Sequence, residues 1–436
     1  MRTRQLHPRK VNIITLGCSK NMVDSEVLSG QLSANNIEVV HENAKLDHQI
    51  VVVNTCGFID KAKEESVQTI LEQVELKKKG KLEKVYVTGC LSERYKSNLE
   101  TEIPEVDAYF GTMELPLLLK TLEADYKAEL VGERLLATPS HYAYLKISEG
   151  CNRTCSFCAI PLMRGGHVSR SMESLVEEAT LLVSRGVKEI MLIAQELTYY
   201  GLDLYKRRAL PELLNRLADI KGLEWIRLHY AYPSKFPLEI LDVIRDRPKI
   251  CKYLDMPLQH ASDRMLMAMK RQITRSEMEE LLATIRSTIP GICLRTTLIV
   301  GFPGETREDI EQLKEFLTQQ QFDRVGVFTY SHEEDTSAFT LADTLTQEEK
   351  EARAQEIMEW QQDISYALNQ KKIGQEFRVI VDKKEAGRYI ARSAADSVEV
   401  DNEIIIQTQK KLAPGQFVTV RITKAYDYDL EGELVG

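Results

Sequence analysis

The sequence lacks the long apolar runs of a membrane protein. None of its 436 residues belongs to a run close to the roughly 20 apolar residues that a transmembrane helix needs. The apolar stretch at residues 11–16 is too short for the core of a secretory signal peptide. Internal repeats and low-complexity segments are absent as well. We therefore expect a cytoplasmic protein that makes no use of a membrane.

The sequence also lacks a basic excess. It has 57 Lys and Arg residues against 66 Asp and Glu residues, a formal net charge of −9. Phosphate contacts require basic surface, so this balance weighs against a protein that depends on gripping nucleic acid. With 28% charged and 43% hydrophobic residues the chain is ordinary globular material. At roughly 150 residues per domain, its length predicts about three domains.

The first predicted domain covers residues 10–124 and belongs to the α/β class. Short β-rich runs alternate there with amphipathic helical stretches such as residues 60–79. This alternation predicts a parallel sheet covered by helices. The β-rich runs are residues 11–17, 49–55, 84–89 and 107–111. An irregular stretch, residues 124–140, is the predicted linker.

The second predicted domain covers residues 140–372. Six strand-like runs alternate with helices, which predicts a partial (β/α)6 barrel rather than the eight units of a complete one. A long polar helix over residues 346–372 trails it. The strand-like runs are residues 142–148, 189–195, 225–230, 253–258, 294–300 and 324–330.

The third predicted domain covers residues 373–436. Its short strands are separated by Gly or Pro turns, which predicts a small all-β barrel. The predicted strands are residues 376–382, 388–391, 403–407 and 416–422.

The strongest chemical signal is a triplet of cysteines, Cys151, Cys155 and Cys158. Three thiolates within eight residues favour a zinc or iron–sulfur site. Structural zinc sites and ferredoxin-type clusters both take four ligands, however, and the local set stops at three. Three protein ligands on a four-iron cluster would leave one iron open to bind another molecule.

The triplet resembles the CxxxCxxC motif of the radical S-adenosylmethionine (SAM) enzymes, with the aromatic Phe157 before the last cysteine. This resemblance implies a [4Fe–4S] cluster whose open iron binds SAM and whose electron generates a 5′-deoxyadenosyl radical. Active sites of (β/α) barrels lie at the C-terminal ends of the strands, and the triplet follows the first predicted barrel strand.

Three further cysteines each close a different predicted parallel strand: Cys18, Cys56 and Cys90. Ligands of open parallel sheets bind outside the carboxyl ends of the strands, so these thiols are predicted to converge on a second metal site. The small neighbours Gly17, Gly57 and Gly89 are expected to allow a bulky ligand to approach the backbone.

The segments Leu-Gly-Cys18-Ser-Lys-Asn, Asn-Thr-Cys56-Gly-Phe-Ile and Thr-Gly-Cys90 resemble the N-terminal domain of the methylthiotransferases. That resemblance extends over nearly the whole chain, with the C-terminal β module similar to a TRAM domain. It implies two [4Fe–4S] clusters, the second one on Cys18, Cys56 and Cys90.

The same resemblance implies SAM contacts at Gln195, Glu196, Gly301 and Gly304. The family commonly has Gln-Asp where this chain has Gln195-Glu196, one methylene longer. From the residues alone, Gly301 and Gly304 would mark only a tight turn. His260 is interpreted as structural. Cys251 and Cys293 match no ligand pattern and are interpreted as packing residues.

Methylthiotransferases divide mainly between those that modify a tRNA adenosine and one that modifies an aspartate of the small-subunit ribosomal protein S-twelve. The tRNA group more typically has Gln-Met-Asn where this chain has Ser-Lys-Asn, and Ser after the second cysteine where it has Gly57. The terminal module has nine basic and eleven acidic residues, a balance of −2 that is poor for tRNA binding. Both features favour the aspartate-modifying branch.

The implied reaction places a methylthio group on Cβ of the aspartate. It uses two SAM molecules, a sulfur donor and a reductant such as flavodoxin, with nucleic acid met at most through the ribosome. A tRNA-modifying enzyme and a non-catalytic iron–sulfur binding protein are the alternatives.

Overall fold

The computed structural model describes residues 10–43, 47–127 and 133–435, so part of the predicted linker lies outside the described residues. By its contacts the chain forms two units. The first comprises residues 1–138, 149–152 and 159–181, and the second comprises residues 139–148, 153–158 and 182–436. Part of the predicted second domain thus packs with the first domain.

The first unit is built on a parallel sheet, as predicted. Its strand order is β2-β1-β3-β4-β5, and every neighbouring pair is parallel. The short edge strand β2, whose polar ends are the exposed Glu38 and the half-buried His41, was not expected from the sequence. The strands are β1 (Lys10–Thr15), β2 (Glu38–His41), β3 (Ile50–Thr55), β4 (Lys84–Gly89) and β5 (Ala108–Tyr109).

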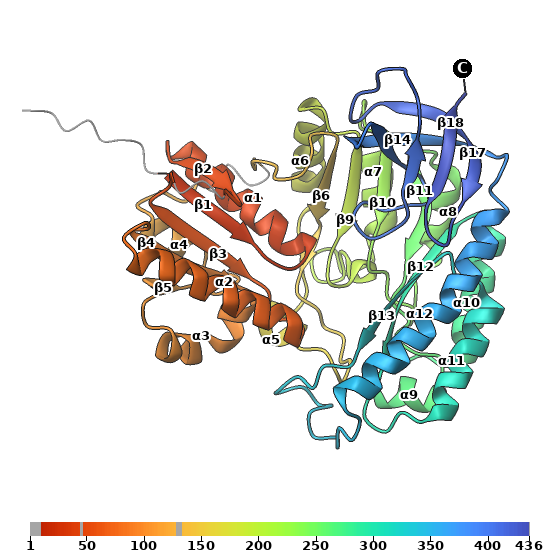
Figure 1. Ribbon diagram of the computed structural model, residues 1–436, viewed down its shortest axis with the longest axis horizontal. Coiled ribbons are helices and arrows are strands. Elements are labelled where there is room, and N and C mark those ends of the chain that lie inside the picture. The colour runs from red at the N-terminus through yellow and green to blue at the C-terminus, as the bar shows by residue number, and fades with distance from the viewer. Residues whose placement is uncertain (1–9, 44–46, 128–132, 436) are drawn as a thin grey trace, which may run out of the picture. The chain divides into compact units, whose positions relative to one another are not determined.

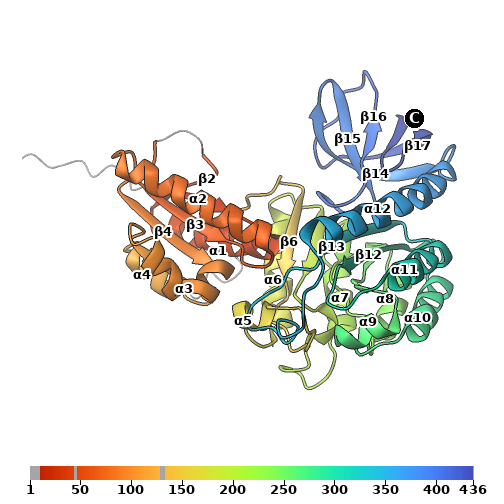
Figure 2. The same ribbon diagram turned by 60° about the horizontal axis from the view of Figure 1, so that its bottom comes forward.

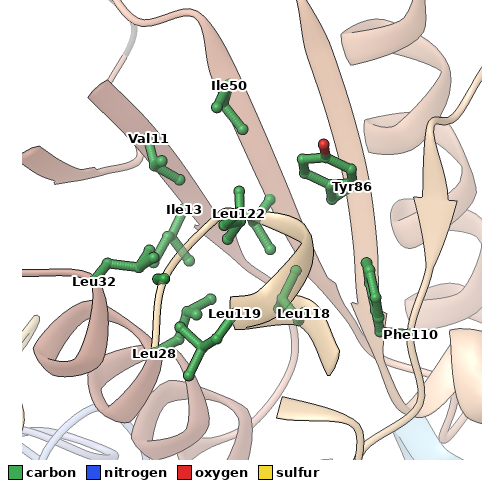
Figure 3. Close-up of a cluster of buried hydrophobic side chains, with 12 residues drawn as sticks. Val11, Ile13, Leu28, Leu32, Ile50, Tyr86, Phe110, Leu118, Leu119 and Leu122 are labelled. Carbon is green, nitrogen blue, oxygen red and sulfur yellow. The ribbon is translucent and has the colours of Figure 1, made fainter. Parts of the chain in front are cut away.

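Helices cover both faces of this sheet (Figure 1). On one face α1 (Ser19–Ala34) and α4 (Leu115–Thr121) enclose an apolar cluster that includes Ile13 and Leu119, both fully buried (Figure 3). On the other face α2 (Asp60–Lys78) and α3 (Cys90–Glu102) enclose a second cluster. Strand β3, buried at every position, is shared by both cores. The two cores fix where β1, β3 and β4 end.

A buried arginine joins later elements to this unit. The Arg134 guanidinium lies 2.5 Å from Glu26 on α1 and 2.9 Å from Glu178 on α6. Because all three groups are nearly inaccessible to water, the ion pairs hold the segment after the N-terminal domain firmly against α1. The later elements are α5 (Ile160–Arg164), β8 (Val168–Ser169) and α6 (Met172–Ser184), which extends into the second unit.

The second unit contains the predicted six-stranded parallel sheet, in the order β13-β12-β11-β10-β9-β6. The strands are β6 (Tyr142–Lys146), β9 (Glu189–Ile193), β10 (Trp225–Leu228), β11 (Ile250–Asp255), β12 (Cys293–Val300) and β13 (Arg324–Thr329), and the two-residue β7 (Ser148–Glu149) follows β6. The intervening helices are η2 (Leu197–Tyr199), α7 (Leu210–Ala218), α8 (Glu239–Asp246), α9 (Asp263–Ala268), α10 (Arg275–Thr288) and α11 (Arg307–Gln320).

The long helix α12 (Gln347–Gln370) matches the predicted trailing helix closely. It starts at a capping box in which the Thr346 side chain accepts from the Glu349 backbone and the Glu349 carboxylate accepts from the Thr346 backbone. Helix α12 packs on β13 and α11. No helix of the described residues is long and apolar enough to cross a membrane.

The C-terminal module is a closed five-stranded barrel, order β14-β15-β16-β18-β17, as the sequence predicted in outline (Figure 2). Strand β18 was missed because its sequence, Leu-Glu-Gly-Glu-Leu, carries two acids and a glycine. The strands are β14 (Glu376–Glu385), β15 (Arg388–Ser393), β16 (Ile404–Ile406), β17 (Phe417–Ala425) and β18 (Leu430–Leu434).

Buried ion pairs join this module to the parallel sheet. Glu189, the first residue of β9, lies between Arg227 of β10 and Arg392 of β15, at 2.9 and 2.8 Å. Arg324 of β13 lies 2.6 Å from Asp396, in the loop after β15. All these side chains are almost completely buried, so the two parts of this unit share one interior.

Candidate functional sites

The structure brings together the N-terminal thiol set, Cys18, Cys56 and Cys90. Their strands β1, β3 and β4 are direct neighbours in the sheet. Cys18 precedes α1, Cys56 follows β3 directly, and Cys90 is the first residue of α3. Parallel neighbours end at the same edge, so the three thiols meet at the carboxyl edge of the sheet, as the sequence predicted.

Burial and the neighbouring thiols shift the pKa values in this set. Burial raises the pKa of the Cys56 thiol to about 11, and the Cys18 and Cys90 thiols raise it further. Burial likewise raises the pKa of Cys90, with Cys18 adding to the effect and the Arg164 guanidinium opposing it. Both shifts favour the protonated thiols of Cys56 and Cys90, and metal binding would release these protons.

Glycines permit the close approach of these three strand ends. Gly17 has φ +90°, and a Cβ there would lie 2.7 Å from the Cys56 sulfur. A Cβ on Gly57 would lie 2.9 Å from the Leu91 backbone nitrogen, and one on Gly89 would lie 2.5 Å from the Thr55 carbonyl oxygen. From the sequence, we expected the small size of these glycines to allow a bulky ligand to approach the backbone. In the structure the glycines make room for protein atoms of the neighbouring loops.

Asn21, which sequence reasoning did not single out, connects the thiol-bearing loops. Its Nδ2 donates to the Leu16 carbonyl after β1 at 2.8 Å and to the Thr55 carbonyl at the end of β3 at 3.0 Å. Its Oδ1 is left to accept from Arg164. Asn21 lies within the Gly-Cys18-Ser-Lys-Asn segment, so its place beside the cysteine was the only signal available.

Single-ion chemistry does not suit this set. Among residues 10–43, 47–127 and 133–435, no three His, Cys, Asp or Glu side chains are close enough together to hold one metal ion. A four-iron cluster binds each thiol at a different iron, so its ligands lie further apart than those of one ion. Three thiols on three strand ends fit such a cluster with one iron left open.

The central triplet is divided between the two units: Cys151 belongs to the first, and Cys155 and Cys158 belong to the second. In the first unit the backbone N–H of Cys151 donates to the Gly165 carbonyl at 3.1 Å. In the second unit the backbone N–H of Cys158 donates to the Cys155 carbonyl at 3.2 Å. The aromatic Phe157 packs in an apolar cluster with Met269 and Phe302.

Arg271 and Tyr232 contact the Cys155 sulfur. Arg271 donates from Nη1 to the Cys155 sulfur at 3.1 Å, and the Tyr232 hydroxyl lies 3.7 Å from that sulfur. The guanidinium groups of Arg153 and Arg271 lie 3.8 and 4.2 Å from the centre of the Tyr232 ring. This cation–π arrangement holds Arg271 and Tyr232 in place beside the Cys155 sulfur. No spacing rule of the sequence could have identified it.

Glu196 has both carboxylate oxygens engaged by the protein. One accepts from Arg153 at 2.8 and 3.1 Å, and the other accepts from the backbone and hydroxyl of Thr198, both at 2.7 Å. Glu196 therefore orients Arg153. Gln195, half-buried, directly precedes it beyond the end of β9.

Gly301 and Gly304 form the turn after β12, with φ of +77° and +81°. A Cβ at Gly301 would lie 2.4 Å from Cγ of Lys350 on α12, so this glycine accommodates protein atoms on that side. The Glu305 carboxylate accepts from the Gly301 backbone at 2.9 Å and from Arg353 at 2.6 Å. The turn is thereby held rigid.

The remaining candidate residues, His260, Cys251 and Cys293, are buried and contact only other protein groups. The Nδ1 of His260 accepts from the backbone N–H groups of Ala261 and Ser262 at 2.9 and 3.0 Å, and Nε2 faces Glu305 at 3.4 Å. Cys251 and Cys293 are buried in an apolar cluster with Trp225. Burial raises the pKa of Cys251 to about 11, which disfavours a thiolate.

Family models match three segments of the chain. Residues 10–111 match the uncharacterized protein family UPF0004, residues 145–317 the radical SAM superfamily, and residues 373–435 the TRAM domain. Among solved structures, the radical SAM methyltransferase TsrM of Kitasatospora setae has a TM-score of 0.55 at 15% identity, covering 94% of this chain and 84% of that one. This likeness shows the fold alone.

Curated relatives match over the full length. The ribosomal protein uS12 methylthiotransferase RimO of Flavobacterium johnsoniae is 58% identical, covering 99% of this chain and 100% of that protein. The RimO protein of Cytophaga hutchinsonii is 55% identical, covering 100% of both. The chain therefore belongs to the radical SAM superfamily and, within it, to the RimO family of methylthiotransferases.

Proposed function

We propose that this protein attaches a methylthio group to Cβ of an aspartate in ribosomal protein uS12, the protein S-twelve. Two SAM molecules, a sulfur donor and a reductant such as flavodoxin are consumed, and the reaction takes place in the cytoplasm. Relatives that are named ribosomal protein uS12 methylthiotransferases and are 58% identical over their whole length support this substrate.

The observation that carries the proposal is the presence of two separate thiol sets. Formation of a SAM-derived radical needs only the central triplet. The N-terminal thiol set adds three more converging cysteines, held by Asn21 and by three tightly packed glycines. A second cluster site of this kind suits an enzyme that must also deliver sulfur to carbon.

We propose that two [4Fe–4S] clusters bind, one on Cys18, Cys56 and Cys90 and the other on Cys151, Cys155 and Cys158. When bound, these cofactors and SAM supply the radical that removes hydrogen from an unactivated carbon and the sulfur that replaces it. Arg271 and Tyr232 hold the Cys155 sulfur in place.

Further residues shape the neighbouring loops for SAM. We propose contacts at Gln195, Gly301 and Gly304, while Glu196 acts by orienting Arg153. Glu305 fixes the backbone of the Gly301 turn through its hydrogen bond with the Gly301 N–H. A loop held in this way can position a cofactor without rearranging on binding.

The charge of the terminal barrel supports a protein substrate over tRNA. Of its nine basic residues, Arg392 is buried between Glu189 and Asp382 and is therefore unable to contact a phosphate. The buried Asp396 offsets this arginine, so the other eight basic and ten acidic residues keep the balance at −2, which is poor for tRNA binding.

A two-substrate assay tests the proposal. The reconstituted protein is incubated with SAM and reductant, together with either uS12 or tRNA, and both products are analysed by mass spectrometry. We expect a methylthio group on one aspartate of uS12 and none on tRNA. Modification of tRNA alone would identify the tRNA-modifying alternative, and iron binding without SAM cleavage would identify a non-catalytic protein. Cys56→Ala should abolish the product, whereas the matched control Cys251→Ala should retain it.

A further inference from the structure

Arg164 reaches a thiol of the N-terminal set from outside the N-terminal domain of the sequence. It is the last residue of α5, six positions after Cys158, and α5 packs in the first unit beside Cys90. Its Nε donates to the Cys90 sulfur at 3.2 Å. The Arg164 side chain is only 4% exposed, so this is a charge-assisted hydrogen bond shielded from water.

Groups other than the thiol fix the direction of this hydrogen bond. Nη2 of Arg164 donates to Asn21 Oδ1 at 2.5 Å, and Nη1 donates to Asp24 at 2.6 Å and to Glu149 at 3.3 Å. Asn21 is itself fixed, because its amide nitrogen donates to two backbone carbonyls. The planar guanidinium is thus locked at one end, which aims Nε at the sulfur.

The positive group near Cys90 lies closer to its sulfur than the negative groups do. The positive guanidinium touches the sulfur directly, while the carboxylates of Asp24 and Glu149 bind its far nitrogen, Nη1. Hydrogen bonds to cysteine sulfur and the nearby net charge are the main protein controls on the reduction potential of an iron–sulfur cluster. A cation on the ligand sulfur stabilises the more negative, reduced state.

We propose that Arg164 is a positioning residue that holds the Cys90 sulfur and raises the reduction potential of the cluster on the N-terminal thiol set. This inference rests on the proposed function, which places a cluster there. The proposal gives a role to an arginine that follows the central triplet in the sequence. It requires no contact of Arg164 with substrate or SAM.

The test uses the full-length chain with Cys151, Cys155 and Cys158 replaced by Ala, so that only the N-terminal cluster remains. After anaerobic reconstitution, its potential is measured by a redox titration followed by electron paramagnetic resonance. In this background Arg164→Met should shift the midpoint potential to more negative values, and Arg164→Lys should shift it less. The control is Arg170→Met, which removes a partly buried arginine of the same unit that binds Glu178 rather than a thiol, and it should leave the potential unchanged.

A second variant separates electrostatic tuning from a purely structural role. Asp24→Asn removes a carboxylate 2.6 Å from Nη1 and should shift the potential in the opposite direction, to more positive values. This arm also decides the question if Arg164→Met fails to bind iron. Equal potentials in all variants, at about four irons each, would overturn the inference alone. A background protein without iron would overturn the proposed function and the inference with it.

Discussion

Replacing Glu189 with Gln should strongly destabilise the second unit. The Glu189 side chain is fully buried and accepts from Nε of Arg227 at 2.9 Å, while Arg392 lies 2.8 Å from its other oxygen. Arg392 retains Asp382 at 2.7 Å, but Glu189 is the only carboxylate within ion-pair distance of Arg227 among the described residues, so Arg227 loses its partner. Breaking one partner out of a buried ion pair costs about 3–5 kcal/mol, because a buried charge loses its compensation.

The chain offers a matched control for this variant. Glu224 pairs with Arg378 at 2.7 Å and also joins the parallel sheet to the terminal barrel, but both side chains are at least 40% exposed. Exposed pairs contribute about 0–1 kcal/mol, so Glu224→Gln should change little. The free energy of unfolding is measured for both variants by urea titration of the metal-free protein at pH 7.

A double-mutant cycle identifies the cause. Glu189→Gln should be partly compensated by Arg227→Met, because the second change removes the guanidinium that has lost its carboxylate. A loss below about 1 kcal/mol for Glu189→Gln, equal to that of Glu224→Gln, would refute the reasoning. It would mean that the buried pair contributes no more than an exposed one.

Three further predictions concern acid stability, packing and cofactor positioning. Burial would raise the pKa of Asp255, but hydrogen bonding from His229 and the charge of Arg295 lower it to about 2 from 3.8. Its stabilisation is therefore complete above pH ~4 and is lost as the pH falls towards ~2, about 2 kcal/mol in all, and this pH dependence should disappear in Asp255→Asn. Gly57→Ala should displace the Leu91 backbone and reduce the iron bound by the N-terminal thiol set. A Cβ added at Gly80 would meet no atom within 4 Å, so Gly80→Ala should leave the iron content unchanged. Glu196→Ala should weaken SAM binding about tenfold in a direct binding assay by releasing Arg153, and unchanged SAM affinity would contradict that role.

Much of the fold could be predicted because its signals are local. Strands β3 and β4 and helices α2 and α12 follow hydrophobic periodicity and capping residues, and they were placed within two residues of their observed bounds. Strands β2 and β18 were missed, since the polar or acidic residues in their sequences resemble those of loops. Register and pairing partners outweigh propensity at such positions.

The candidate site was predictable only in part. The cysteines carry spacing and strand-end signals, and the N-terminal set converges as predicted. The charged groups around them carry none. Nothing in the order of residues tells Arg164 or Arg271 apart from the many other arginines of the chain, because their contacts with Cys90 and Cys155 depend on tertiary packing.

Iron counting tests most directly the central claim that two independent thiol sets each hold a cluster. Two triple Ala variants are reconstituted anaerobically, one at Cys18, Cys56 and Cys90 and the other at Cys151, Cys155 and Cys158, beside a Cys251→Ala, Cys293→Ala control. We predict about eight irons per chain for the control and about four for each triple variant. Complete loss of iron from either triple variant, or an unchanged count of about eight, would contradict the claim.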